Sequence, residues 1–192
     1  MSIFSSLADE HGGKFRRFNQ GKGLSKNWAS MSSGLAAQNG ICGGLSIAFL
    51  ATERMGTKES KLSEKGAETD GALYCYAERL AIFGADNSNG IEGIDNALSK
   101  VAMRRCSAVL TSAIPNTVAK NCVKSPSGLS YLALYSGSHA TAVAIQNGQY
   151  IYFDPNFGFA KFPDSLKFVL FLESFLDAGV YDSSRMGVIW VK

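Results

Sequence analysis

The chain has 192 residues, a net charge of +3 and only 18% charged residues, which fits one domain with a sizeable core and excludes a highly charged, disordered chain. The four cysteines have no zinc-motif spacing and only two histidines accompany them, so we expect neither a metal nor another cofactor. No apolar run reaches the roughly 18 residues of a membrane helix, and the first residues lack the apolar core of a cleaved signal peptide.

Residues 1–33 are polar, and the stretch from His11 to Thr52 contains no acidic residue. Its basic side chains are Lys14, Arg16, Arg17, Lys22 and Lys26, interleaved with Phe15, Phe18 and Trp28. We interpret residues 1–33 as a solvated, flexible N-terminal arm and residues 34–192 as the folded domain. The alternative is that the arm binds an acidic partner or makes transient contact with an anionic membrane.

Three helices are predicted in the first half of the domain. The first begins near Cys42 and ends at Gly56, and the second covers Asp70–Phe83. The third runs from about Ile94 to Leu110, because Pro115 prevents its extension. Residues 57–70 are charged and residues 84–90 are rich in turn formers, so both segments are predicted to be exposed loops.

After Pro126 the apolar residues recur with the period of a strand. L-S-Y-L-A-L-Y, H-A-T-A-V-A-I-Q and Q-Y-I-Y-F-D predict three strands, and Asn147-Gly148 predicts a two-residue turn between the last two. A helix between Pro163 and Gly179 and a last strand, M-G-V-I-W-V, complete the chain. Helices followed by an antiparallel sheet with one inserted helix indicate an α+β domain.

The Asn147-Gly148 turn also predicts the register of its hairpin, because Gln146 must then face Gln149. In this register Thr141 faces Asp154, and His139 is a diagonal neighbour of Asp154 on the same face, roughly 7–8 Å away between backbones. A carboxylate that ends a buried apolar run needs a partner. We therefore expect a hydrogen bond between the imidazole and the carboxylate.

A histidine held by a carboxylate has a fixed tautomer and a raised basicity, which serves a nucleophile. The simpler interpretation of this pair is a structural histidine. The simpler interpretation of Cys42 alone is a small buried hydrophobe. The stretch Asn39-Gly40-Ile41-Cys42-Gly43-Gly44 favours chemistry, because it places a cysteine where a glycine-rich turn enters a helix. Backbone amides and the helix dipole stabilise a thiolate there.

Three motifs, N-G-I-C-G-G-L-S, G-S-H-A-T-A-V and F-D-P-N-F-G, resemble those of the YopT-type cysteine proteases, papain-like bacterial virulence effectors that include AvrPphB. The D-P-N-x-G element is the most specific of the three. The resemblance implies a papain-like fold, in which N-terminal helices carrying the nucleophile pack on an antiparallel sheet carrying His and Asp. It implies that Cys42 is the nucleophile, His139 the general base and then acid, and Asp154 the orienting carboxylate.

The oxyanion hole departs from the pattern of the plant papain-type enzymes. Their glutamine stands six residues before the cysteine, a position that Ala36 occupies here. Gln38 is our first candidate for the side-chain donor and Asn39 the second, with the Cys42 backbone N–H as the other donor.

We therefore expect a cysteine endopeptidase that cleaves a host protein through a thioester acyl-enzyme. The resemblance implies a small GTPase or a signalling kinase as substrate, secretion by a bacterium without a cleaved signal peptide, and action in the host cytosol. We expect a monomer that binds no nucleic acid. Two alternatives stay open: the same triad in a glutamine deamidase, a transglutaminase-like enzyme or a peptidoglycan amidase, and a non-catalytic binding module that uses the basic segment from Lys14 to Lys26.

Overall fold

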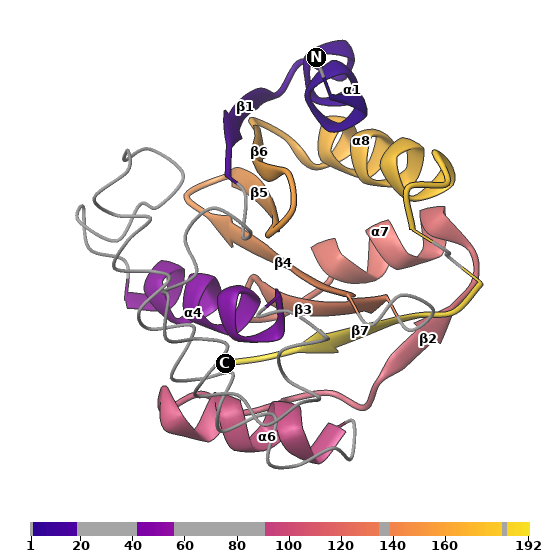
Figure 1. Ribbon diagram of the computed structural model, residues 1–192. Coiled ribbons are helices and arrows are strands. Elements are labelled where there is room, and N and C mark those ends of the chain that lie inside the picture. The colour runs from indigo at the N-terminus through magenta and orange to yellow at the C-terminus, as the bar shows by residue number, and fades with distance from the viewer. Residues whose placement is uncertain (1, 19–41, 56–90, 135–138, 182–183) are drawn as a thin grey trace, which may run out of the picture.

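The computed structural model describes residues 2–18, 42–55, 91–134, 139–181 and 184–192, and a single antiparallel sheet lies at their centre (Figure 1). Its seven strands have the order β1-β6-β5-β4-β3-β7-β2. They are β1 (Lys14–Arg17), β2 (Leu110–Ser112), β3 (Leu129–Leu134), β4 (His139–Gln146), β5 (Gln149–Asp154), β6 (Gly158–Phe162) and β7 (Met186–Trp190). The central strands β3, β4 and β5 are the three that the alternation of apolar residues after Pro126 predicts.

Helices cover both faces of the sheet (Figure 1). One buried cluster joins one face to α4 (Cys42–Met55) and α6 (Ile91–Lys100). The other cluster joins the opposite face to α1 (Ile3–Glu10), α7 (Pro115–Val123) and α8 (Ser165–Asp177). Alternate residues of one strand serve the two clusters: Ile151 and Phe153 pack toward α4, and Tyr152 packs toward α8. None of the helices among the described residues has the length and apolar character that a membrane span requires.

The hairpin of β4 and β5 has the predicted register. Its ladder runs from Gln146 opposite Gln149 to Ala142 opposite Phe153. Asn147 and Gly148 form the turn with φ angles of 50° and 71°, the left-handed conformation that a two-residue hairpin of this type requires. The ladder ends one pair before the expected pairing of Thr141 with Asp154.

Residues 3–17, which the sequence analysis assigned to a flexible arm, instead form a helix and a strand of the sheet. Ser2 caps α1 in a reciprocal capping box with Ser5. Strand β1 pairs with β6, and the Phe18 N–H donates to the Phe157 carbonyl at 3.1 Å. Phe4 of α1 is wholly buried among aromatic rings of α8 and β5. The predicted boundary between residues 33 and 34 lies outside the described residues and stays a prediction.

Other differences concern short elements. Helix α6 ends at Lys100 rather than Leu110, because the chain turns through Ala102 at a φ of 54°. Pro115 begins α7, where its missing N–H costs no hydrogen bond. Strands β1, β2 and β6 have three to five residues each, too few for a clear period in the sequence. The predicted helix at 70–83 and the predicted loops at 57–70 and 84–90 lie outside the described residues.

Candidate active site

The three predicted catalytic residues each stand at the end of an element. Cys42 is the first residue of α4, His139 the first of β4 and Asp154 the last of β5. Helix α4 packs along β4 and β5, which brings these ends to one edge of the sheet. All three residues are buried, with 5%, 7% and 0% of their surfaces exposed. The fold therefore brings together a thiol, an imidazole and a carboxylate from three separate elements.

The expected hydrogen bond between the imidazole and the carboxylate is present. His139 Nε2 lies 3.0 Å from Asp154 Oδ1. A second hydrogen bond joins the His139 side chain to Cys42. Because Nε2 is engaged by the carboxylate, Nδ1 is the ring nitrogen left to face the thiol. The imidazole thus bridges Asp154 and Cys42.

Asp154 is held by donors on its own turn and on a distant segment. The Asn156 backbone N–H donates to Oδ1 at 2.8 Å, in an aspartate turn closed by the Phe157 N–H on the Asp154 carbonyl at 3.1 Å. The Tyr181 hydroxyl donates to Oδ1 at 3.2 Å and to Oδ2 at 3.1 Å. These hydrogen bonds, together with His139, compensate the loss of hydration of a fully buried carboxylate.

The glycine of the D-P-N-x-G motif makes room for the N-terminal strand. Gly158 has a φ of +132°, and a Cβ built on it would lie 2.1 Å from the Arg16 carbonyl oxygen and 2.7 Å from the Phe18 nitrogen. Only glycine allows β1 to approach this closely beside the turn that carries Asp154. The motif therefore links the carboxylate to the pairing of β1 with β6.

Two opposing effects act on the pKa of His139. Burial disfavours the protonated ring, but hydrogen bonds and charge interactions with Asp154 and Cys42 outweigh it and raise the pKa to about 9. At neutral pH the ring is therefore an imidazolium beside the Cys42 sulfur. A positively charged ring beside the sulfur is the arrangement that activates a nucleophilic cysteine.

The described residues include two cysteines besides Cys42. Cys122 is fully buried, and desolvation raises the pKa of its thiol to about 12, so it is chemically inert. Cys106 is half-buried in the segment after α6, where its N–H donates to the Trp190 carbonyl at 2.8 Å. The predicted helix from Ile94 to Leu110 would have included Cys106, but α6 ends at Lys100 and Cys106 lies outside it. Cys75 and the predicted oxyanion-hole residues Gln38 and Asn39 lie outside the described residues.

Tyr181 and the side chain of Asn156 belong to the site although no sequence pattern indicates their hydrogen bonds. Asn156 belongs to the quoted D-P-N motif, and its side-chain Nδ2 donates to the Tyr181 oxygen at 3.0 Å. Tyr181 stands in no motif, in the segment between α8 and β7. Its only signal in the sequence is its residue type, a large apolar ring with a hydroxyl that needs a partner when buried.

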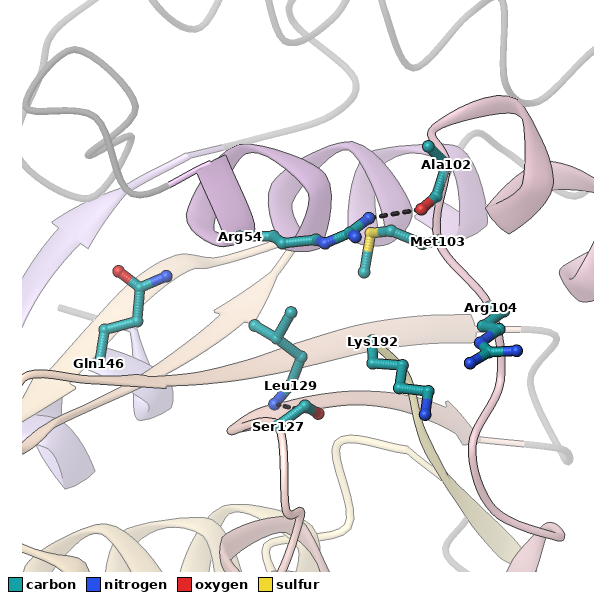
Figure 2. A pocket seen from close by; sticks show the side chains of 8 residues that line it. All are labelled: Arg54, Ala102, Met103, Arg104, Ser127, Leu129, Gln146 and Lys192. Atoms are coloured by element: carbon teal, nitrogen blue, oxygen red, sulfur yellow. Dashed lines mark hydrogen bonds between the residues drawn. The ribbon is translucent and has the colours of Figure 1, made fainter.

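A separate cavity of about 540 Å³ lies at the other end of α4 (Figure 2). Its lining residues are Arg54, Ala102, Met103, Arg104, Ser127, Leu129, Gln146 and Lys192. The Arg54 guanidinium donates to the carbonyl of Ala102, another residue that lines this cavity (Figure 2). Arg54 lies twelve positions after Cys42 on the helix, about 18 Å along the axis, so the cavity is distinct from the candidate active site.

The family model Peptidase_C58, described as Yersinia/Haemophilus virulence surface antigen, matches residues 92–187, half of the chain. The matched region contains His139 and Asp154, and Cys42 precedes it. A search of curated proteins finds no match.

Solved structures that share the fold include the following two. The avirulence protein AvrPphB of Pseudomonas is 17% identical, with a TM-score of 0.63 over 86% of this chain and 99% of its own. PatoxP, a cysteine protease-like domain of the Photorhabdus asymbiotica toxin PaTox, is 13% identical, with a TM-score of 0.52 over 97% of this chain and 56% of its own. These likenesses confirm the predicted α+β, papain-like fold.

Proposed function

The chain belongs to the family of YopT- and AvrPphB-type cysteine proteases, and we propose that Cys42, His139 and Asp154 are its catalytic triad. The observation that carries this proposal is the bridging position of His139. Its Nε2 lies 3.0 Å from a fully buried carboxylate, while the ring is also hydrogen-bonded to a cysteine at the first residue of a helix. A purely structural histidine needs no thiol at that place.

The reaction begins with attack of the Cys42 sulfur on a peptide carbonyl. The carbonyl oxygen becomes an oxyanion, stabilised by the Cys42 backbone N–H at the start of α4 and by the Gln38 or Asn39 side chain. The His139 imidazolium gives its Nδ1 proton to the departing amine as the C–N bond breaks, which leaves a thioester on Cys42.

Hydrolysis of the thioester reverses these proton movements. The neutral His139 ring accepts a proton from water as the water oxygen attacks the thioester carbonyl. The C–S bond then breaks, the new carboxyl group leaves, and the thiolate–imidazolium pair is restored. Asp154 holds Nε2 throughout, so that Nδ1 always faces the sulfur and the reacting bond.

The substrate that we propose is a host protein, with a small GTPase or a signalling kinase as the first candidates from the family resemblance. The protein would be secreted by a bacterium and act in the host cytosol. The catalytic domain would include α1 and β1, because β1 pairs with β6 next to the turn of Asp154.

The experiment that tests this proposal is labelling of new protein N-termini in host cells that express either the wild-type chain or Cys42→Ala. We expect a small set of new termini in the wild-type sample that are absent with Cys42→Ala. A mass gain of about 1 Da on an intact target, without new termini, would contradict the endopeptidase and favour deamidation. New termini that persist with Cys42→Ala would contradict the choice of nucleophile.

A further inference from the structure

Tyr181 lies flat on the ring of the proposed catalytic histidine. The two ring centroids are 4.5 Å apart and the planes differ by 22°, which is a stacked arrangement. Phe157 and Phe175 contact Tyr181 edge-on, at centroid distances of 6.4 Å and 6.1 Å. The tyrosine ring is therefore fixed between the end of α8, the Asp154 turn and His139.

The hydroxyl group of Tyr181 holds the proposed catalytic carboxylate. It lies 3.1 Å from Asp154 Oδ2, and among the described residues no other donor reaches that oxygen. The Asn156 Nδ2 donates to the tyrosine oxygen at 3.0 Å, which leaves the hydroxyl proton for Asp154. Burial and the charge of Asp154 raise the pKa of Tyr181, so the hydroxyl stays protonated and remains a donor.

We propose that Tyr181 is a positioning residue of the active site, which fixes the Asp154 carboxylate with its hydroxyl and shields the hydrogen bond between His139 and Asp154 with its ring. The inference rests on the proposed function, because it assigns Tyr181 a part in the same reaction. Its physical basis is that a hydrogen bond kept from water is stronger, and that an aromatic face stabilises a cation lying on it.

The titratable neighbours of His139 show which charge determines the protonation of its ring. Among the described residues, the titratable groups that face the imidazole or its partner are Cys42 of α4, Asp154 and Tyr152 of β5, and Tyr181. Asp154 is the only carboxylate among them, and its hydrogen bond and charge raise the pKa of His139. A residue that excludes water from this carboxylate and orients it toward Nε2 therefore influences the pKa of the imidazole.

The competing interpretation is that Tyr181 only packs the end of α8 against the Asp154 turn. A packing role predicts that any variant which keeps the fold also keeps the properties of the His139 ring. The proposed role predicts that the pKa of His139 and the exchange of its Nε2 proton with water change, even where stability does not. These two quantities separate the interpretations without a protease substrate.

The test uses NMR on the full chain, which has only two histidines. His11→Gln assigns the two ring signals, and His11 serves as the internal reference. Tyr181→Phe removes the hydroxyl and keeps the ring, whereas Tyr181→Leu removes both. Tyr150→Phe is the matched control, since the Tyr150 ring packs on Phe168 and away from His139.

We expect the His139 titration midpoint, about 9 in the wild type, to fall by about one unit in Tyr181→Leu and by less in Tyr181→Phe. The Nε2 proton should exchange at least about tenfold faster in both variants, and Tyr150→Phe should match the wild type. Asn156→Ala should have the effect of Tyr181→Phe, and the double variant should add little, because both changes disable one hydrogen-bonded chain. A midpoint and an exchange rate that stay at wild-type values in both Tyr181 variants would overturn the inference.

This outcome is independent of the test of the proposed function. Cleavage that survives Cys42→Ala would remove Cys42 from the reaction, yet the titration of His139 would still report whether Tyr181 shields its ring. Conversely, unchanged NMR signals in the Tyr181 variants would leave the cleavage experiment with Cys42→Ala unaffected.

Discussion

His139 and Asp154 lie fifteen residues apart in the chain, and their side chains meet at 3.0 Å between Nε2 and Oδ1. The two-residue turn at Asn147-Gly148 brings their strands together, and the turn after Asp154 aims its carboxylate at the ring. Since the pair is buried, each charge depends on the other for compensation.

Asp154→Asn should lower kcat/KM by about 10²–10⁴-fold, because the neutral amide no longer stabilises the imidazolium or fixes its tautomer. Asp154→Ala should also lower the free energy of unfolding by about 3–5 kcal/mol, since it leaves a buried cation without its partner. Enzyme assays and urea denaturation measure the two effects. Asp177→Asn, at the exposed end of α8, is the control and should change neither. Wild-type kinetics in Asp154→Asn would remove this residue from the mechanism.

The pH dependence of activity and stability should report His139. Its pKa is raised from the ordinary 6.5 to about 9 in the folded protein, so the protonated ring contributes stability that is complete below about 6.5. That contribution is lost as the pH rises from 6.5 through 9. The kcat/KM profile should fall through the same pH of about 9, because the leaving amine needs the imidazolium proton. An alkaline limb near 6.5 would show that Asp154 and Cys42 do not stabilise the charged ring.

Gly158→Ala should destabilise the protein by about 3 kcal/mol or more, because its Cβ would overlap the backbone of β1 and its positive φ disfavours alanine. Gly179→Ala is the matched control. It has a φ of +69° with no atom within 4 Å of the added Cβ, and should lose about 1 kcal/mol. Urea unfolding of both variants measures the difference. Equal losses in the free energy of unfolding would mean that β1 does not pack closely against Gly158.

The oxyanion hole can be assigned by two single substitutions. If Gln38 supplies the side-chain donor, Gln38→Ala should lower kcat by about 10²–10³-fold with little change in stability, and Asn39→Ala should remain active. The reverse result would assign the donor to Asn39. Turnover that is unaffected in both variants, with folding verified by circular dichroism, would contradict both candidates.

The sequence predicts the β4–β5 hairpin and the contact between its His139 and Asp154, because residues within the hairpin determine both. Asn147-Gly148 specifies the turn, and the alternation of apolar residues along β4 and β5 specifies which side chains share a face. The same holds for α4, whose beginning near Cys42 the local sequence predicts. Such signals lie within a few residues of the feature that they predict.

Other features depend on contacts between distant segments, and local patterns do not reveal them. The four residues of β1, K-F-R-R, become a strand because Gly158 lets them pair with β6. Arg16 lies with its guanidinium 4.2 Å from the centroid of the Phe159 ring, a contact that no charge count predicts. Tyr181 reaches the site only because α8 ends beside the Asp154 turn.

If the sulfur of Cys42 performs the cleavage, cysteine variants of this chain must differ in one respect only. Purified wild-type chain, Cys42→Ala, Cys106→Ser, Cys122→Ser and Cys75→Ala would each be incubated with the protein target that terminal labelling identifies, and the products read by intact mass. We expect two fragments whose masses sum to the target plus one water with every chain except Cys42→Ala. Cleavage by Cys42→Ala at the wild-type rate, or its loss in a folded variant of one of the other three cysteines, would contradict Cys42 as the nucleophile.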